Sequence, residues 1–310
     1  MTTALISHPD CLAHITPEGH PERVARLQAV LAMLDGKDLL RVAAPQAADA
    51  DLELAHPARY VARIRATGPA EGVVQLDPDT WMSPGSLTAA LSAAGGALKA
   101  VDLVLQGQAD NAFVACRPPG HHAETETPMG FCLFGNVAIA AKHALERHGL
   151  TRVAIVDFDV HHGNGTQDLL QNDPRILFIS SHQMPLYPDT GAPEETGGHD
   201  NVMNIALRAG ADGHAYRTIL ADRILPRLRD FAPELILISA GFDAHRDDPL
   251  AGLCLVEADF AEITEAICEL AAEVCNGRVV SCLEGGYDLD ALANSAAVHV
   301  DALIAAGQKS

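Results

Sequence analysis

The sequence predicts an α/β protein in which a mostly parallel sheet is covered by helices on both faces. Short apolar runs alternate with segments of helical length, and this alternation is typical of parallel sheets. Hydrophobic residues make up 48% of the 310 positions, which is enough for a sizeable core. The sequence contains no internal repeat and no long Pro/Gly linker, so we expect one domain spanning residues 1–310.

Each expected strand is a short run rich in apolar and β-branched residues. These runs cover residues 112–116, 153–158, 176–179, 202–207, 235–239 and 279–283. The expected helices lie between them, at residues 86–105, 135–148, 213–230 and 256–275. Residues 183–200 form a long loop containing Pro, Gly and Asp, and loops of this length in a compact domain are often functional.

Composition restricts the classes of partner. The formal charge is -20, from 21 Lys+Arg against 41 Asp+Glu, so the chain lacks the cationic surface that nucleic-acid binding needs. An acidic surface favours cationic partners such as lysine-rich peptides or polyamines, although it also serves solubility. The N-terminus lacks a signal sequence and we find no run of roughly 18 apolar residues, which predicts a cytoplasmic protein without a membrane partner. Seven scattered cysteines without CxxC spacing indicate reduced thiols.

Polar segments follow five of the predicted strands. In open parallel sheets, ligands bind beyond the carboxyl ends of the strands, so these segments should meet at one edge. They are residues 117–122 (RPPGHH), 159–166 (DVHHGNGT), 180–183 (SSHQ), 241–245 (GFDAH) and 284–288 (EGGYD).

A metal site is expected within these segments. Residues two apart in a strand share a face, so Asp157, Asp159 and His161 can project together, and Asp243 comes from another strand end. One imidazole and two carboxylates leave a coordination position open, as in catalytic zinc sites, although Fe(II) or Co(II) would also fit. Any one of these residues alone could simply cap a loop or a helix. Gathering all of them without a cation would be electrostatically expensive.

Six ordered motifs carry a family resemblance: 117–123 (RPPGHHA), 130–132 (GFC), 157–167 (DFDVHHGNGTQ), 180–183 (SSHQ), 241–250 (GFDAHRDDPL) and 284–288 (EGGYD). In these motifs the chain resembles the histone deacetylase superfamily, specifically the class II-like bacterial histone deacetylase-like amidohydrolases. The motifs span most of the chain in the family's order. The resemblance implies an arginase-like, three-layer α/β fold with a mostly parallel sheet of about eight strands flanked by helices.

The resemblance also assigns the metal. Asp159, His161 and Asp243 match the family's ligands for one catalytic zinc ion per chain, the same three residues that strand geometry indicated. His121 and His122 match its tandem active-site histidines. A general base within reach of the attacking water is what amide hydrolysis requires.

The two histidines are expected to differ because their partners differ. In the family pattern His121 pairs with Asp157, and a carboxylate favours the charged imidazolium. His122 faces Asn164, an amide, and is therefore expected to stay neutral and act as the general base. Tyr287 matches the tyrosine whose hydroxyl donates to the developing oxyanion.

The resemblance places a narrow substrate channel around the metal. Phe131 and Tyr187 correspond to the aromatic residues that flank the aliphatic stem of an acyl-lysine. Gly130 and Gly285 would line the channel where close approach is needed. Leu250 stands where relatives specialised for acetylated polyamines carry a glutamate, so its apolar side chain argues against that selectivity.

An interior potassium site is implied as well. Its ligands would come from Asp157 and Ser180 and from the backbone carbonyls around Asp159, His161 and Ser181. Hard oxygen atoms suit this ion.

The function expected from these residues is a zinc-dependent amidohydrolase that removes an acetyl or other acyl group from an Nε-acyl-lysine peptide or a small acylated amine. Alternatives are an acetylpolyamine amidohydrolase, a catalytically silent acyl-lysine binding protein, and a binuclear ureohydrolase. The last would need further metal carboxylates where this chain has His121 and His122. The physiological substrate and a homo-oligomeric state are left open.

Overall fold

A single sheet of eight parallel strands forms the centre of the computed structural model, which describes residues 2–308. The strand order is β2-β1-β5-β10-β9-β6-β7-β8. The strands are β1 (Thr3–Ser7), β2 (Leu40–Ala43), β5 (Asn111–Val114), β6 (Val153–Asp157), β7 (Ile176–Gln183), β8 (Val202–Leu207), β9 (Leu235–Ala240) and β10 (Val279–Leu283). Each strand pairing in this sheet is parallel. The six predicted strands are therefore all present, and the expected count of about eight is confirmed.

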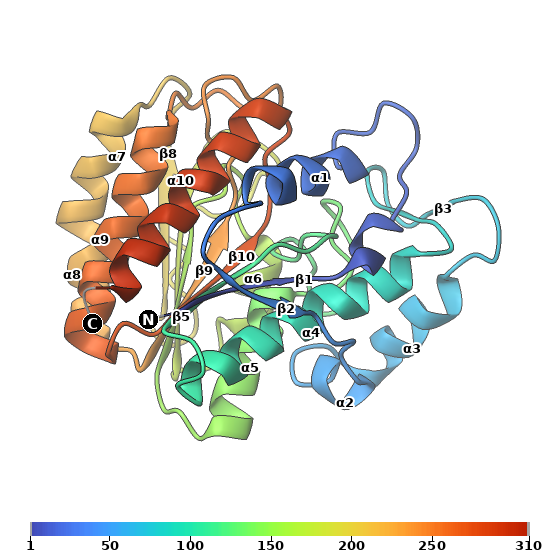
Figure 1. Ribbon diagram of the computed structural model, residues 1–310, viewed down its shortest axis with the longest axis horizontal. Coiled ribbons are helices and arrows are strands. Elements are labelled where there is room, and N and C mark those ends of the chain that lie inside the picture. The colour runs from blue at the N-terminus through green and yellow to red at the C-terminus, as the bar shows by residue number, and fades with distance from the viewer. Residues whose placement is uncertain (1, 309–310) are drawn as a thin grey trace.

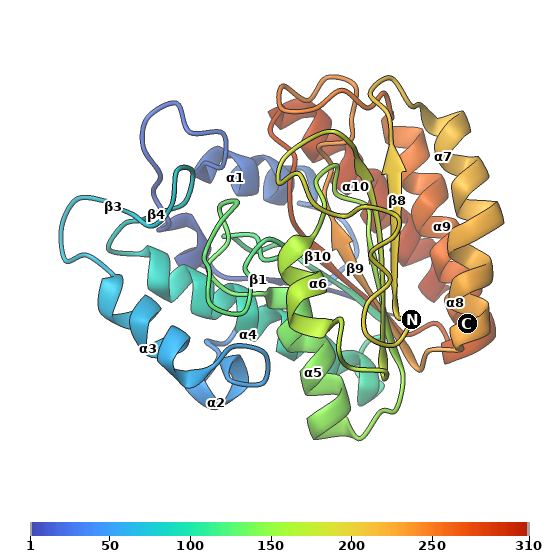
Figure 2. The same cartoon turned by 180° about the vertical axis from the view of Figure 1, so that it is seen from behind.

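Helices form a layer on each face of the sheet (Figures 1 and 2). One layer contains α1 (Val24–Met33), α7 (Gly213–Ile219), α8 (Leu225–Phe231), α9 (Glu257–Cys275) and α10 (Leu289–Gly307). The other contains α4 (Ser86–Leu105), α5 (Asn136–His148) and α6 (Asn164–Leu170), with α2 (Asp49–Leu52) and α3 (Ala58–Thr67) outside α4. A short antiparallel pair, β3 (Val74–Gln75) and β4 (Trp81–Met82), lies apart from the main sheet. The three-layer α/β prediction is confirmed.

The sequence interpretation missed several elements for identifiable reasons. β2 is an edge strand whose residues are mostly exposed, so it lacks the apolar run that marks a buried strand. The predicted helix at 213–230 is divided by a π-helical turn at Leu220–Ile224, with a proline in the first turn of α8. α10 was not predicted, although Asp288 caps it by accepting a hydrogen bond from the amide of Ala291, a recognisable start signal.

Two helices have the length and mean hydropathy of a membrane span, namely Ser86–Leu105 and Leu289–Gly307. Within the fold, 78% and 56% of their most apolar 18-residue windows are buried. Their apolar surface is therefore used largely for packing against the sheet and neighbouring helices.

Candidate metal centre and active site

Loops that follow β5, β6, β7, β9 and β10 meet at the carboxyl edge of the sheet, as the sequence predicted. Hydrogen bonds join these loops directly. The amide of Val160 donates to Asp243 Oδ1 at 2.9 Å. The amide of Gly285 donates to Asp159 Oδ2 at 2.8 Å. Carboxylates from two loops are thus held in place by the backbone of their neighbours.

Asp159, His161 and Asp243 form a buried group whose ligand atoms all lie within 4.8 Å of one another. His161 Nδ1 lies 3.1 Å from Asp159 Oδ1 and 3.2 Å from Asp243 Oδ2. β6 ends at Asp157, so Asp159 and His161 lie in the loop beyond it rather than on the strand. Asp157 does not join the group and faces His121 instead.

The charges of this group suit a divalent cation. Burial and the neighbouring charge of Asp159 raise the pKa of Asp243 to about 7, because two buried carboxylates repel each other. In bound tetrahedral zinc, ligand atoms at 2.0–2.2 Å from the metal stand roughly 3.3–3.6 Å apart, slightly more than the separations from His161. A Cβ on Gly285 would fall well inside contact distance of both Asp159 and Asp243. The glycine therefore lets the loop close tightly over the two carboxylates.

His121 is held as a charged ring. Its Nδ1 lies 3.0 Å from Asp157 Oδ2, and both side chains are buried. Burial alone would lower the pKa of His121, but the charges of Asp159 and Asp157 outweigh it and hold that pKa well above its usual value. Glu284, for which no role was predicted, holds the same loop, because its carboxylate accepts hydrogen bonds from the amides of Gly120 and His121.

His122 is held as a neutral ring. Burial and then the positive charges of His121 and His161 keep the pKa of His122 well below its usual value. Its Nδ1 lies 2.7 Å from Asn164 Oδ1. The Asn164 amide nitrogen donates to Glu124 Oε1 at 2.8 Å, so the amide oxygen is the atom that faces the ring. His122 Nδ1 must then carry the proton, which leaves Nε2 free to accept one.

Tyr287 is fixed by groups around its ring and backbone. The Arg26 guanidinium lies over the ring at 4.8 Å from its centroid. Arg26 also donates to the carbonyl oxygens of Gly286 and Glu284, at 2.5 Å and 2.6 Å. The amide of Tyr287 donates to Asp248 Oδ2 at 2.7 Å. Burial raises the pKa of Tyr287 well above its usual value, so the hydroxyl stays protonated and can act as a donor.

A pocket of about 270 Å³ leads to the metal group. Its lining includes the predicted channel residues Gly130, Phe131, Tyr187 and Leu250, together with His122, His161, Tyr287, Asp79 and Leu186. Of these, Tyr187 and Leu250 are 37% and 36% exposed, which places them at the rim. Gly130 has φ 55°, and a Cβ there would overlap His122. Apolar and aromatic walls around a polar floor are typical of small-molecule sites.

The predicted potassium ligands lie at and just beyond the end of β6 and in the second half of β7. Asp157 pairs in register with Ser180, and Ser181 Oγ donates to the carbonyl oxygen of Asp157 at 3.3 Å. Ser180 Oγ lies 3.0 Å from His182 Nδ1, so that hydroxyl already has a partner. The residues are buried and offer oxygen atoms, and potassium binding here stays a prediction.

A buried ion-pair network behind the site was not anticipated. Glu22 accepts two hydrogen bonds from the Arg117 guanidinium and one from Arg26, and all three side chains are fully buried. His14 lies 3.4 Å from the same carboxylate. The arginine of the 117–123 motif and the glutamate before α1 were visible in the sequence, but nothing in their spacing shows that they pair.

Comparison with known proteins agrees with this geometry. The family model described as "Histone deacetylase domain" matches residues 20–303. The "Histone deacetylase-like amidohydrolase" of Pseudomonas aeruginosa is 41% identical over 273 residues, covering 86% of this chain and 71% of that protein. "Polyamine deacetylase HDAC10" of Homo sapiens is 37% identical over 327 residues, covering 98% of this chain and 48% of that protein. Among solved structures, the HDA15 HD domain is similar with a TM-score of 0.92 at 33% identity, covering 99% of this chain and 91% of that chain.

Proposed function

This chain belongs to the histone deacetylase family, and on that premise we propose that it is a zinc-dependent deacylase. The substrate would be an Nε-acyl-lysine side chain or a related small amide. One observation carries the proposal: His161, which is grouped with Asp159 and Asp243, lines a single pocket together with a neutral His122 and with Tyr287.

Asp159, His161 and Asp243 would hold the zinc ion. When bound, the ion supplies a Lewis acid for the amide carbonyl and lowers the pKa of water. The chain itself supplies the compact carboxylate pair, the His161 lone pair and a buried setting that keeps charges unscreened.

Proton transfer falls to His122. Its Nε2 accepts a proton from the attacking water, and the C–N bond then breaks as the same nitrogen returns that proton to the leaving amine. His121 keeps its charge beside Asp157 throughout and stabilises negative charge that develops nearby. The Asn164–Glu124 pair keeps the correct nitrogen of His122 free.

Tyr287 donates its hydroxyl proton as a hydrogen bond to the carbonyl oxygen as that oxygen becomes negative. Phe131 lies close to Tyr287, with ring centroids 5.8 Å apart, and Tyr187 lies across the pocket against His122 at 5.2 Å. The aliphatic stem of an acyl-lysine would pass between these two aromatic side chains.

A second candidate is an acetylpolyamine amidohydrolase, which one named relative and the net charge of -20 both support. Leu250 opposes it, because an apolar side chain at the rim offers no charge to a substrate ammonium. Turnover of an acetyl-lysine peptide and of acetylspermidine should be compared on zinc-loaded protein. Faster turnover of the peptide supports the first proposal, and faster turnover of acetylspermidine supports the second.

The alternative of a binding protein without catalysis is tested with a panel of acyl-lysine peptides. If zinc-loaded protein binds an acyl-lysine peptide and turns over none of a series from acetyl to long-chain acyl groups, the chain is a binding protein and the proposal fails. With the acyl panel, His122→Ala should remove nearly all turnover while leaving zinc content unchanged, because His122 is not among the proposed ligands.

A further inference from the structure

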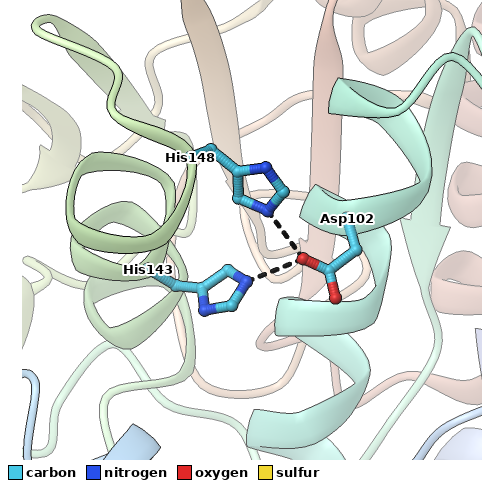
Figure 3. A group of neighbouring side chains, drawn as sticks. All are labelled: Asp102, His143 and His148. Carbon is cyan, nitrogen blue, oxygen red and sulfur yellow. Dashed lines mark hydrogen bonds and ion pairs between the residues drawn. The ribbon is translucent and has the colours of Figure 1, made fainter.

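Asp102, His143 and His148 form a second group of metal-ligating side chains, between α4 and α5 (Figure 3). Asp102 Oδ1 lies 2.8 Å from His143 Nε2 and 2.7 Å from His148 Nε2. Both imidazoles come from α5 and point toward the α4 carboxylate. The three ligand atoms lie within 4.8 Å of one another.

This group lies away from the candidate active site. α4 ends at Leu105 and α5 at His148, shortly before β5 and β6 begin, whereas the metal centre follows the carboxyl ends of the strands. The group is therefore at the opposite end of the sheet, and nothing in the proposed hydrolysis uses it.

The surroundings allow an ion to enter and to keep an open coordination position. The side chains of His143, His148 and Asp102 are 11%, 18% and 31% exposed, so they are sheltered but reachable. A cavity of about 150 Å³ lies against His143 and Asp102. Its lining also contains one lysine, Lys99, and one further carboxylate, Asp51. Water in this cavity could complete the coordination of an ion held by three protein ligands.

We propose that Asp102, His143 and His148 form a second metal site, which binds a first-row divalent ion such as Zn²⁺ or Co²⁺. Two imidazoles and one carboxylate are a ligand set suited to these ions. The carboxylate now bridges the two Nε2 atoms by accepting hydrogen bonds, and an ion would replace the protons between them.

Binding here is weaker than at the candidate active site, for two structural reasons. Oδ1–Nε2 separations of 2.7–2.8 Å must open by about 0.5–0.9 Å to reach the spacing of ligands around zinc, whereas the distances from His161 are already 3.1–3.2 Å. In addition, Nδ1 of His143 is buried with no hydrogen-bond partner among residues 2–308, so no second group orients that ring. A bound ion would join α4 to α5 and stabilise the fold by mass action.

The experiment counts metal ions on the full-length chain. Chelated protein is dialysed against Co²⁺ or Zn²⁺, the bound metal is measured by elemental analysis, and the Co²⁺ visible spectrum reports nitrogen and oxygen coordination. The variants are His148→Ala and Asp102→Asn, with Asp243→Ala to disable the candidate active site. His214→Ala is the matched control, because His214 is an exposed histidine on α7.

Two ions per chain are expected for the wild type and for His214→Ala, and one for each of the other three single variants. The double variant Asp243→Ala/His148→Ala should bind none. A chelator should remove the second ion before the first, and folded His148→Ala should keep wild-type deacylase activity. The proposal is overturned if folded His148→Ala and Asp102→Asn bind as much metal as His214→Ala. The metal count does not depend on turnover. It also distinguishes this site from a binuclear active site, because Asp243→Ala alone would remove both ions from a binuclear site.

Discussion

Replacing Tyr287 with phenylalanine removes one hydroxyl and little else. No residue within 2–308 forms a hydrogen bond with that hydroxyl in the resting structure. The ring packing against Arg26 and the backbone bond to Asp248 both survive the change. The free energy of unfolding should therefore change by no more than about 0.5 kcal/mol.

The expected loss is in catalysis. Tyr287 contributes the buried hydroxyl of the pocket, since the other tyrosine in the lining, Tyr187, is 37% exposed at the rim. Loss of one oxyanion donor typically lowers kcat by about 10²–10³, which corresponds to roughly 2.7–4 kcal/mol of transition-state stabilisation. KM should change little, because the hydrogen bond strengthens only as charge develops on the oxygen.

Steady-state kinetics on an acetyl-lysine peptide measure this directly, with zinc content and Tm checked for each variant. Tyr187→Phe is the matched control, because it makes the same chemical change on the other side of the pocket and should lower kcat by less than about fivefold. The assigned role of Tyr287 is refuted if Tyr287→Phe keeps most of the wild-type kcat, or if it lowers kcat no more than Tyr187→Phe does.

Three further predictions concern stability, metal affinity and selectivity. Glu22→Gln leaves the buried Arg117 without its anionic partner and should cost about 3–5 kcal/mol of stability at neutral pH, measured by urea unfolding. Burial raises the pKa of Glu22, but the charge of Arg117 and the His14 hydrogen bond outweigh burial and hold that pKa well below its usual value. The stability that ionised Glu22 contributes to the wild type is therefore present above the ordinary carboxyl pKa. It is lost at up to about 1.4 kcal/mol per pH unit as the pH falls further. Gly285→Ala should displace the carboxylate of Asp243 and weaken zinc binding by about tenfold or more in a chelator competition. Leu250→Glu should raise kcat/KM for acetylspermidine relative to acetyl-lysine peptide by about fivefold, the scale of one partly exposed ion pair.

Each of these changes has a control. Glu53→Gln makes the same change on an exposed residue and should shift stability by less than about 0.5 kcal/mol. Gly252→Ala adds a methyl group with no neighbour closer than 3.2 Å and should keep zinc affinity. Leu250→Gln adds polarity without charge, so a selectivity change equal to that of Leu250→Glu would contradict the electrostatic explanation. Equal unfolding free energies for Glu22→Gln and wild type at pH 7 would contradict the ion-pair account.

Much of the fold could be predicted from the sequence because buried parallel strands consist of short runs of apolar residues. β6, β9 and β10 are buried along their whole lengths and were recognised as strands. β2 was not recognised, because an exposed edge strand has no continuous apolar run. The interruption between α7 and α8 also had no periodicity signal, since the apolar spacing continues through the π-helical turn.

The candidate site was predictable where its chemistry lies in consecutive motifs. Asp159 and His161 follow one strand directly, and the partners of His121 and His122 were inferred correctly as Asp157 and Asn164. The contacts that could not be predicted are those by which residues distant in sequence orient the side chains of the site.

Glu124 orients Asn164, and Arg26 packs on Tyr287 across 261 positions of sequence. Such contacts depend on how loops fold back over the sheet edge. Neither residue type nor local spacing encodes them.

The central claim, that the group Asp159, His161 and Asp243 holds a catalytic zinc ion, is tested most directly by metal reconstitution. Chelated protein is titrated with Zn²⁺ while acetate release from an acetyl-lysine peptide is measured, with His122→Ala and His148→Ala in parallel. Activity should be absent without metal, should rise to its plateau with the first equivalent in both wild type and His148→Ala, and should stay near zero in zinc-loaded His122→Ala. Full activity in the chelated protein, or zinc-loaded wild type that releases no acyl group from any substrate, would contradict the account.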